Sequence, residues 1–556
     1  MLARAFVFLV LWILPQVAAA QDTRATVRDR VFETAQTAQS STAGKALAQA
    51  ATRIAAGSAE LAALLRDRQD TGDVLDSLND RLAAAALETG AAAERAIATL
   101  RRSIAETRER RAALDRDLDR RFPEFRELTN PRPLSRAQVQ NLLRPGEALI
   151  MTLTDQSYFY AWAITATGAD WMRVEIERET IADMVRTVRG TLSVERDNRA
   201  GMALKKPVTT RAGGFDRAVA HRLYRTLFAP LEHVFGGADH VMMVLDGPLT
   251  SLPPAVLVTD PPDGADSDPA ALRSTGWLLR RHALTTLPSV SALRALRRAA
   301  APAVGAQSVP MVGFGDPLLG YRLTAEATGA VPDDDRVLTR GVYEDVSRVA
   351  DLAPLPNTAR ELRALARTMK AGEAALYLGA EATERAVKEA DLSRARIVAF
   401  ATHGLLADGL PGLDEPALVF TPPAVPSEVD DALLTASEAA QLELSASLVI
   451  LSACDTAGSD GTPGSEGLSG LARAFIYAGA RAILVSHWPV DDYAASQLTT
   501  AMLDGMYGPG ALTRAEALRR AALAILDDTG DARLAHPRIW APFVVVGEGG
   551  ADATPG

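Results

Sequence analysis

The sequence has almost no cysteine. Cys454 is the only one among 556 residues, so an internal disulfide is excluded, and so is a zinc site built from a cysteine cluster. The single thiol can be an inert buried side chain, an intermolecular link or a reactive nucleophile. The sequence around Cys454 is needed to distinguish these three roles.

Motifs for metals and phosphate groups are also lacking. No G-x-x-x-x-G-K-[ST] phosphate loop occurs in the sequence, and no pair of histidines has the H-x-x-x-H or H-E-x-x-H spacing that holds zinc on one helix. We therefore expect neither a metal nor another cofactor. The histidines to which we assign structural roles are His221, His233, His240, His282 and His487.

Positive charge is not in excess, since the formal net charge is −10. A nucleic-acid partner is therefore not expected, because such a partner calls for a concentrated basic surface. Hydrophobic residues make up 48% of the chain and charged residues 23%, which is typical of a globular protein. The length exceeds that of one ordinary domain and favours two or three.

The N-terminus has the pattern of a secretory signal peptide. Arg4 precedes an apolar run over residues 5–14, and small residues at 18–20 follow Pro15, the order in which a signal peptide places these features. The run is too short to cross a bilayer. We predict a signal peptide over residues 1–20 and an exported bacterial protein of the periplasm or the extracellular space, without an integral membrane segment after cleavage. Retention of the segment as an anchor is the alternative.

Residues 21–130 are predicted to form an all-helical arm. Beyond Ile97, the apolar residues Leu100, Ile104 and Leu118 recur near helical spacing among many charged residues, which indicates a long amphipathic helix. We expect it to pair with an earlier helix through apolar residues that include Val74. The arm either binds a partner protein or packs against the rest of the chain.

Strands and helices alternate after residue 135, which predicts an α/β fold with a mainly parallel sheet and helices on both faces. A linker at 299–307 separates a first α/β module at 135–300 from a second at 308–548. Thr513 and Glu516 form a capping-box pattern that opens one helix. The other helices are predicted at 358–370 and 466–478, and the strands at 148–154, 158–164, 171–176, 240–245, 396–402, 447–453, 481–486 and 540–546.

Two of these strands end in chemically reactive residues. His403 and Gly404 follow one strand, and Cys454 ends the next. If the two strands are neighbours in a parallel sheet, both side chains project from the same edge. A nearby imidazole lowers the pKa of a thiol and produces the nucleophilic thiolate, and the imidazole can then protonate a leaving amine.

The same edge supplies donors for an oxyanion. The backbone N–H groups of Gly404 and Cys454 are the expected pair, and no third catalytic residue is evident. A structural role is the alternative for each residue alone, because buried cysteines and satisfied histidines at strand ends are common. Their joint placement favours a catalytic dyad of His403 and Cys454.

Two segments resemble the signatures of the CHAT domain, a relative of the caspases and separases. They are Ala401-Thr-His403-Gly404 and Leu451-Ser-Ala-Cys454-Asp-Thr456. The 51 residues from His403 to Cys454 are close to the spacing of about 50 in caspases. Further segments that resemble blocks of the same family, in the same order, are Asp246–Pro253, Leu355–Glu361, Ala380–Thr383, Gly464–Gly467, Leu471–Phe475, Ala478–Ala480, Trp488–Asp492 and His536 with Trp540.

The resemblance implies a caspase-like fold of two related modules, of which only the second is active. It also implies a cysteine endopeptidase that acts on a protein or peptide substrate through His403 and Cys454. The chain differs from many CHAT proteins in two respects. Residues 21–130 lack the tetratricopeptide pattern that often precedes the domain, and the N-terminus predicts export where many members are cytoplasmic.

Four acidic residues are candidates for substrate binding. Asp491 and Asp492 lie in a segment similar to the separase stretch that helps to bind a basic P1 side chain, and Asp455 and Glu466 are further candidates near the site. A carboxylate in the S1 pocket would favour arginine or lysine at P1. The alternative is that Asp492 only caps the helix that follows.

Two other functions are consistent with this sequence. One is a catalytically silent, caspase-like scaffold that binds partners through its helical arm. The other is a different acyl transfer at the same thiol. The presence of both His403 and Cys454 favours the peptidase over the scaffold.

Overall fold

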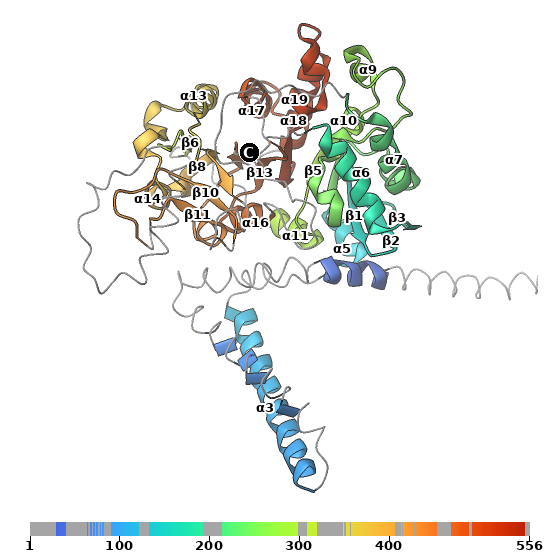
Figure 1. Cartoon of the computed structure of the whole chain (residues 1–556), viewed down its shortest axis with the longest axis vertical. Helices are drawn as coiled ribbons and strands as arrows, with labels where there is room; N and C mark the ends of the chain where they lie inside the picture. Colours follow the sequence, from blue (N-terminus) through green and yellow to red (C-terminus); the bar gives the residue numbers. More distant parts are fainter. Residues whose placement is uncertain are drawn as a thin grey trace, which may run out of the picture.

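A single mixed sheet of eleven strands forms the centre of the molecule (Figure 1). The computed structural model describes residues 29–39, scattered positions between 64 and 82, and residues 91–121, 133–192, 214–298, 308–319, 349, 352–355, 357–405, 413, 415–427, 430–452, 469–488 and 492–550. The strands of the sheet are β1 (Glu147–Thr154), β2 (Tyr158–Thr165), β3 (Ala169–Glu175), β4 (His240–Val244), β5 (Ala283–Thr286), β6 (Val309–Gly315), β7 (Leu376–Leu378), β8 (Ala395–Ala401), β12 (Leu448–Leu451), β13 (Ala482–Ser486) and β14 (Phe543–Gly547).

The sheet consists of two largely parallel sets of strands that run in opposite directions. The strand order is β3-β2-β1-β4-β5-β14-β13-β12-β8-β6-β7. In one set β1, β4, β5 and β14 are parallel, and in the other β13, β12, β8, β6 and β7 are parallel. The carboxyl ends of β8 and β12 therefore meet at one edge of the sheet, and that of β4 lies at the opposite edge.

The last strand, β14, joins the two sets. It pairs antiparallel with β13 from Ala482↔Gly547 to Ser486↔Phe543, and it pairs parallel with β5 at Val546↔Thr286. Strands from both predicted modules thus belong to one continuous sheet. The division into modules at 135–300 and 308–548 stays a prediction.

Helices cover both faces of the sheet (Figure 1). Successive residues of β12 show the division, because Leu448 and Ile450 pack on one side while Val449 and Leu451 pack on the other. This is the buried, two-sided pattern of a parallel strand. The predicted α/β class, with a mainly parallel sheet between helices, is confirmed.

The helices divide between the two faces by their apolar contacts. One face carries α6 (Arg178–Gly190), α7 (Arg217–Leu227), α13 (Thr358–Met369), α17 (Asp492–Tyr507) and α18 (Arg514–Asp527). The other carries α5 (Arg136–Leu142), α11 (Val290–Arg298), α14 (Glu384–Glu389), α15 (Ala436–Ala439) and α16 (Ser469–Tyr477). Other helices in the described part of the chain include α3 (Ala91–Arg121), α8 (Glu232–Phe235), α9 (Pro269–Ser274), α10 (Leu278–Arg281) and α19 (Pro537–Trp540).

A helix at residues 29–39 packs on the first half of the sheet. The rings of Phe32 and Trp162 lie 6.1 Å apart between centroids. Gln36 exchanges two hydrogen bonds with the backbone of Leu134, of 2.8 and 2.9 Å. The buried side-chain amide of Gln36 thus has a hydrogen-bond partner for both its nitrogen and its oxygen. This end of the predicted arm therefore packs against the rest of the chain.

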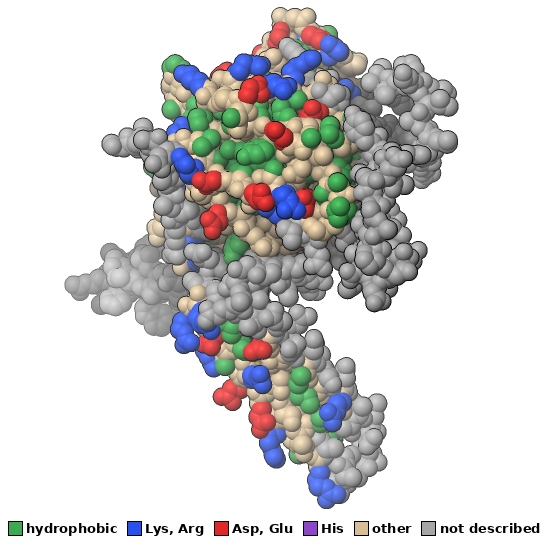
Figure 2. Space-filling model, turned by 90° about the vertical axis from the view of Figure 1, so that its left-hand side faces the viewer, with side chains coloured by type: hydrophobic (Ala, Val, Ile, Leu, Met, Phe, Trp, Pro, Cys, Tyr) green, Lys and Arg blue, Asp and Glu red, His purple; other side chains and the backbone are tan. Residues whose placement is uncertain are grey.

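The long helix α3 projects away from the sheet as a separate arm (Figures 1 and 2). Leu100, Ile104 and Leu118 are buried, which confirms the amphipathic helix predicted from their spacing. Arg68 of the preceding helical stretch forms a 2.7 Å ion pair with Asp115. Val74, expected in the contact between helices, is instead 51% exposed, whereas its neighbour Leu75 is 9% exposed; with 3.6 residues per turn, successive side chains of a helix point in different directions.

One predicted strand begins later than expected, whereas one predicted helix start is confirmed. The strand expected at 540–546 begins only at Phe543, because Pro537 starts the short helix α19, which includes Trp540. At α18, Thr513 accepts the N–H of Glu516 as expected for an N-cap. Within the described part of the chain, no helix combines the length and the apolar character needed to cross a membrane.

Candidate active site

The strands that lead to His403 and Cys454 are neighbours in the sheet. β8 and β12 pair in parallel, with Leu451 opposite Phe400. Their carboxyl ends therefore meet at one edge, as the sequence predicts. Cys454 itself lies outside the described residues, and the last described residue before it is Ser452.

His403 is held by a backbone carbonyl group. Its Nε2 atom lies 2.7 Å from the carbonyl oxygen of Ala353. A carbonyl oxygen only accepts hydrogen bonds, so Nε2 carries the proton in this contact. In the neutral ring, Nδ1 is then the unprotonated nitrogen that can take a proton from a thiol.

Gly404 begins a small second sheet next to His403. This sheet consists of β9 (Gly404–Leu405), β10 (Ala417–Val419) and β11 (Leu433–Thr435), in the order β11-β10-β9. The N–H of Val419 donates to the carbonyl of His403 at 2.9 Å, and Gly404 lies opposite Leu418 in the antiparallel register. Since hydrogen-bonded and non-hydrogen-bonded pairs alternate in such a ladder, the N–H of Gly404 is directed away from β10. The N–H is therefore not used in the pairing with β10, and the role of Gly404 as an oxyanion donor stays a prediction.

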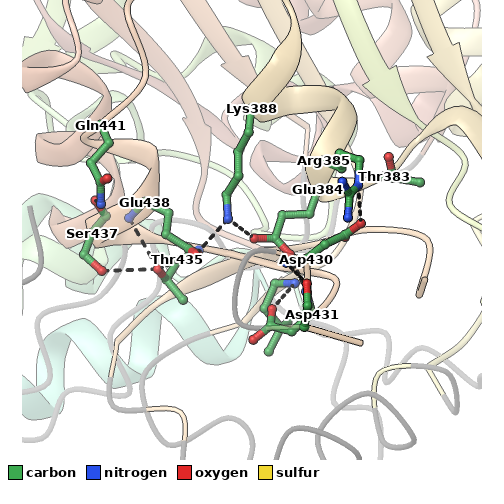
Figure 3. A network of polar contacts seen from close by, with 12 residues as sticks. Thr383, Glu384, Arg385, Lys388, Asp430, Asp431, Thr435, Ser437, Glu438 and Gln441 are labelled. Carbon is green, nitrogen blue, oxygen red and sulfur yellow. Dashed lines mark hydrogen bonds and ion pairs between the residues drawn. The ribbon is translucent and has the colours of Figure 1, made fainter. Parts of the chain in front are cut away.

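A cluster of ionisable side chains fixes β11 against α14 (Figure 3). Glu384 is fully buried and accepts hydrogen bonds from Lys388 and, at 2.7 Å, from the N–H of Asp431. Lys388 also donates to Glu438 of α15 at 2.9 Å. Asp430 lies alongside and pairs with Arg385 at 3.3 Å. Two carboxyl groups, those of Glu384 and Glu438, thus contact one lysine next to the small sheet that carries Gly404.

Burial, together with the neighbouring carboxylates, raises the pKa of Glu384 to about 8, although Lys388 opposes the shift. Burial likewise raises the pKa of Asp431. For Lys388, burial acts to lower the pKa, but the hydrogen bonds to Glu384 and Glu438 outweigh it and the pKa is raised. The cluster therefore gains negative charge as the pH rises.

We expect the contribution of Glu384 to the stability of the protein to fall as the pH rises from about 5 to 9. The pKa of Glu384 is about 8 in the folded protein, which is higher than the pKa of a glutamate in the unfolded chain. The stabilisation by Glu384 is therefore complete at a pH below the unfolded-state pKa, and it is lost as the pH rises through the folded-state pKa. Glu384→Gln should reduce the loss of unfolding free energy over that pH range by on the order of 2 kcal/mol. Urea unfolding at several pH values measures it.

The matched control for this prediction is Glu389→Gln, which changes an exposed residue of the same helix. It should keep the wild-type slope. An equal slope for wild type and Glu384→Gln would show that the cluster does not titrate in this range.

Ser452 contacts α13, which packs on β6 and β8. Its hydroxyl donates to Oε2 of Glu361 at 2.9 Å, and its N–H donates to the carbonyl of Phe400 at 2.9 Å. Glu361 lies in the first turn of α13 and is only 8% exposed. The sequence gives no sign of this contact, although Glu361 ends one of the segments that resemble the CHAT family.

The neighbouring strand β13 ends at two buried aromatic residues. His487 is buried, which lowers its pKa to about 3. Trp488 is buried too and donates from Nε1 to the carbonyl of Arg538 at 2.9 Å. Arg189 of α6 donates to the carbonyl groups of both Ser251 and His487. The block that begins at Asp246 is thereby connected to the end of β13.

The structure describes the side chain of none of the four predicted substrate-binding residues. Asp455, Glu466 and Asp491 lie outside the described residues. α17 begins at Asp492, whose side chain is also outside them. The roles of all four stay predictions.

The histidines predicted to be structural take part in local hydrogen bonds. His221 contacts the carbonyl of Val258 at 3.0 Å, and His282 contacts that of Ala238 at 2.6 Å. His240 lies 2.8 Å from the hydroxyl of Thr285, and burial lowers its pKa to about 4. Among the residues described, no three histidine, cysteine or acidic side chains are grouped as a metal site requires.

Comparison with known proteins identifies a family over more than half of the chain. A family model described as the CHAT domain matches residues 217–548. Tetratricopeptide repeat protein 28 of Homo sapiens is 25% identical over 382 residues, which are 61% of this chain and 13% of that protein. Its counterpart in Mus musculus is 34% identical over 119 residues, 21% of this chain and 4% of that protein. The chain thus spans only a small part of these relatives' length.

Two solved structures are similar at 10% sequence identity. One is the Saccharomyces cerevisiae separase–securin complex at 2.6 Å resolution, with a TM-score of 0.37 over 74% of this chain and 30% of the matched chain. The other is gingipain R, an Arg-specific cysteine proteinase, with a TM-score of 0.30 over 67% of this chain and 74% of that chain.

Proposed function

The chain belongs to the CHAT-domain family, and on this premise we propose that it is an exported cysteine endopeptidase. Cys454 is the nucleophile in this proposal, and His403 is the general acid and base. The observation that carries it is the pairing of β8 with β12, with Leu451 opposite Phe400. Residue 454 follows one of these strands by three positions and residue 403 follows the other by two, which supports their meeting at one edge of the sheet.

The reaction begins with the transfer of a proton from the Cys454 thiol to Nδ1 of His403. The carbonyl of Ala353, 2.7 Å from Nε2, keeps the ring in place and stabilises the imidazolium that forms. The thiolate then attacks the carbonyl carbon of the scissile peptide bond. The π electrons of the carbonyl bond move onto its oxygen, and the N–H groups of Gly404 and Cys454 donate hydrogen bonds to the resulting oxyanion.

The imidazolium next protonates the leaving amine, and the C–N bond breaks to leave an acyl-enzyme. His403 then takes a proton from water, whose oxygen attacks the thioester. Collapse of the second tetrahedral intermediate releases the carboxylic acid product and returns the proton to the thiolate. Each step uses only the two side chains and the backbone donors, which is consistent with a site that needs no cofactor.

The proposal also includes export, a P1 preference and a partner protein, and these three points rest mainly on the sequence. The N-terminal pattern of residues 1–20 supports export, and retention as an anchor is the alternative. The acidic residues Asp491 and Asp492, with Asp455 and Glu466, support a preference for arginine or lysine at P1. The charged α3 arm supports binding of a partner protein, as Figure 2 illustrates by the mixed charges along it.

Labelling of the thiol with a peptidyl acyloxymethyl ketone tests the function. We expect a probe with arginine at P1 to modify wild type at Cys454, as mass spectrometry of the labelled peptide would show, and to leave Cys454→Ala unmodified. A matched probe with alanine at P1 should react more slowly if the acidic residues form the S1 pocket. Equal rates for both probes would contradict the proposed preference for a basic P1 residue and would leave the peptidase proposal in place.

The scaffold alternative predicts a different result. A wild-type protein that no peptidyl probe labels, and whose Cys454→Ala variant keeps its cellular phenotype, would refute the peptidase proposal. Transfer of the acyl group to an added amine instead of water would favour the other acyl-transfer reaction.

A further inference from the structure

A short segment of the chain, residues 353–361, contacts the ends of adjacent strands. All of it except residue 356 is described. At the end of β8, His403 contacts the carbonyl of Ala353. At the end of β6, the N–H of Asp316 donates to the hydroxyl of Thr358 at 3.0 Å. These two strands pair directly in the sheet.

The third contact of this segment is with the strand that leads to Cys454. The carboxylate of Glu361 accepts the hydroxyl of Ser452 at 2.9 Å. In sheet order, β12 lies next to β8 and β8 next to β6. The segment therefore holds three consecutive strand ends with one backbone carbonyl, one hydroxyl and one carboxylate.

Glu361 is rigidly placed by its helix. α13 packs in the main core together with α17, through Leu362 and Leu365 on one side and Leu498 on the other. A carboxylate that is 8% exposed needs strong donors to offset its loss of hydration. The hydroxyl of Ser452 is such a donor, so the contact fixes a defined geometry.

We propose that Glu361 is a positioning residue for the thiol, acting through Ser452; this inference rests on the proposed function. Ser452 is two residues before Cys454, and its backbone is already held by Phe400. The hydrogen bond to Glu361 fixes its side chain as well. The same segment thus contacts both His403 and the strand end that leads to Cys454.

The expected effect is on turnover and not on substrate binding. A misplacement of about 1 Å in a reacting group can cost on the order of 100-fold in rate. We expect Glu361→Ala to lower kcat about 10- to 100-fold and to leave KM within about twofold. Ser452→Ala should do the same. Hydrolysis of a fluorogenic peptide measures both constants.

A conservative variant and a double variant separate this role from a general loss of fold. Glu361→Gln keeps an oxygen that accepts the Ser452 hydroxyl, so it should recover most of the kcat lost in Glu361→Ala. Glu361→Ala combined with Ser452→Ala should be no slower than either single variant, since one contact is lost in all three. Arg363→Ala, an exposed change on the same helix, should match wild type.

Several outcomes would overturn the inference. These are an unchanged kcat in Glu361→Ala, multiplied losses in the double variant, and a Glu361→Gln variant as slow as Glu361→Ala. If wild type reacts with the peptidyl probe and any of these results is found, only the role of Glu361 is wrong. A wild type that neither reacts with the probe nor hydrolyses peptides overturns the peptidase proposal and this inference together.

Discussion

Replacement of His403 by alanine is expected to lower kcat/KM for a peptide substrate about 10³- to 10⁴-fold. In the proposed mechanism two contributions to catalysis are lost at once, because the imidazole both generates the thiolate and protonates the leaving amine. General acid–base catalysis alone supplies about 10²- to 10⁴-fold, and an unassisted thiol is mostly protonated near neutral pH. The effect should appear chiefly in kcat, since the ring is not expected to bind the substrate.

The pH dependence of the residual activity adds a second readout for His403→Ala. Without the imidazole, the rate should rise with pH as the thiol ionises on its own, with a midpoint near the ordinary cysteine value of about 8.5. Initial rates across the pH range, with the protein concentration fixed by active-site labelling, measure this profile.

A matched control for His403 is available in His233. This residue also contacts a backbone carbonyl, that of Pro230 at 3.1 Å, and its other nitrogen pairs with Asp170 at 3.1 Å. It lies in α8, far along the sequence from the strand ends of the site. His233→Ala should therefore keep wild-type kcat/KM. A loss below about tenfold in His403→Ala would mean that another group serves as the acid and base.

The neighbouring strand ends of this site could be predicted from the sequence because both strands are long apolar runs. Residues around 397–402 and 447–453 are almost wholly apolar, and each run ends in a residue with reactive chemistry. Buried parallel strands have this pattern. The structure pairs β8 with β12 as expected. The reactivity of Cys454 itself stays a prediction, as do its oxyanion and substrate-binding partners.

The elements that support the site have much weaker signals. β7, β10 and β11 have three residues each, and β9 has two, which is too short for an alternating pattern to be recognised. The contacts of Ala353 and Glu361 join positions 50 and 91 residues apart. Local propensity carries no information about such contacts, because they depend on how the whole sheet is assembled.

The continuity of the sheet is another feature that the sequence does not predict. The linker at 299–307 indicates two modules, yet β14 pairs with strands of both. β14 pairs with β5, which lies more than 250 residues earlier in the chain. The sequence near either strand does not indicate this pairing. What the sequence does contain is a set of charged residues, Glu147, Arg297, Arg481 and Glu548, whose common environment becomes clear only in the fold.

Replacement of Glu548 by alanine is expected to destabilise the protein by about 3–5 kcal/mol. Glu548 follows β14 and is 1% exposed. Its carboxylate accepts hydrogen bonds from Arg297 at 2.9 Å, from Arg144 at 3.3 Å and from Arg481. Arg297 is itself only 8% exposed. Loss of the carboxylate would leave buried guanidinium groups with too little opposite charge.

The size of this effect follows from the position of Glu548 at the join between the two sets of strands. Arg297 belongs to α11 beside the first set, and Arg481 directly precedes β13 of the second. Arg297 also pairs with Glu147 at 2.6 Å, and we expect this pair to persist in the variant and to limit the loss. Glu548→Gln should cost less than Glu548→Ala, because an amide oxygen still accepts one of the hydrogen bonds.

Urea unfolding followed by tryptophan fluorescence measures these differences. The control is Asp527→Ala, which removes a 2.6 Å pair with Arg280 in which Asp527 is 53% exposed; such exposed pairs contribute about 1 kcal/mol or less. If Glu548→Ala were no more destabilising than this control, the buried network would not be what joins the two halves of the sheet. Two separate unfolding transitions in Glu548→Ala, against one in wild type, would show instead that the join fails before either half unfolds.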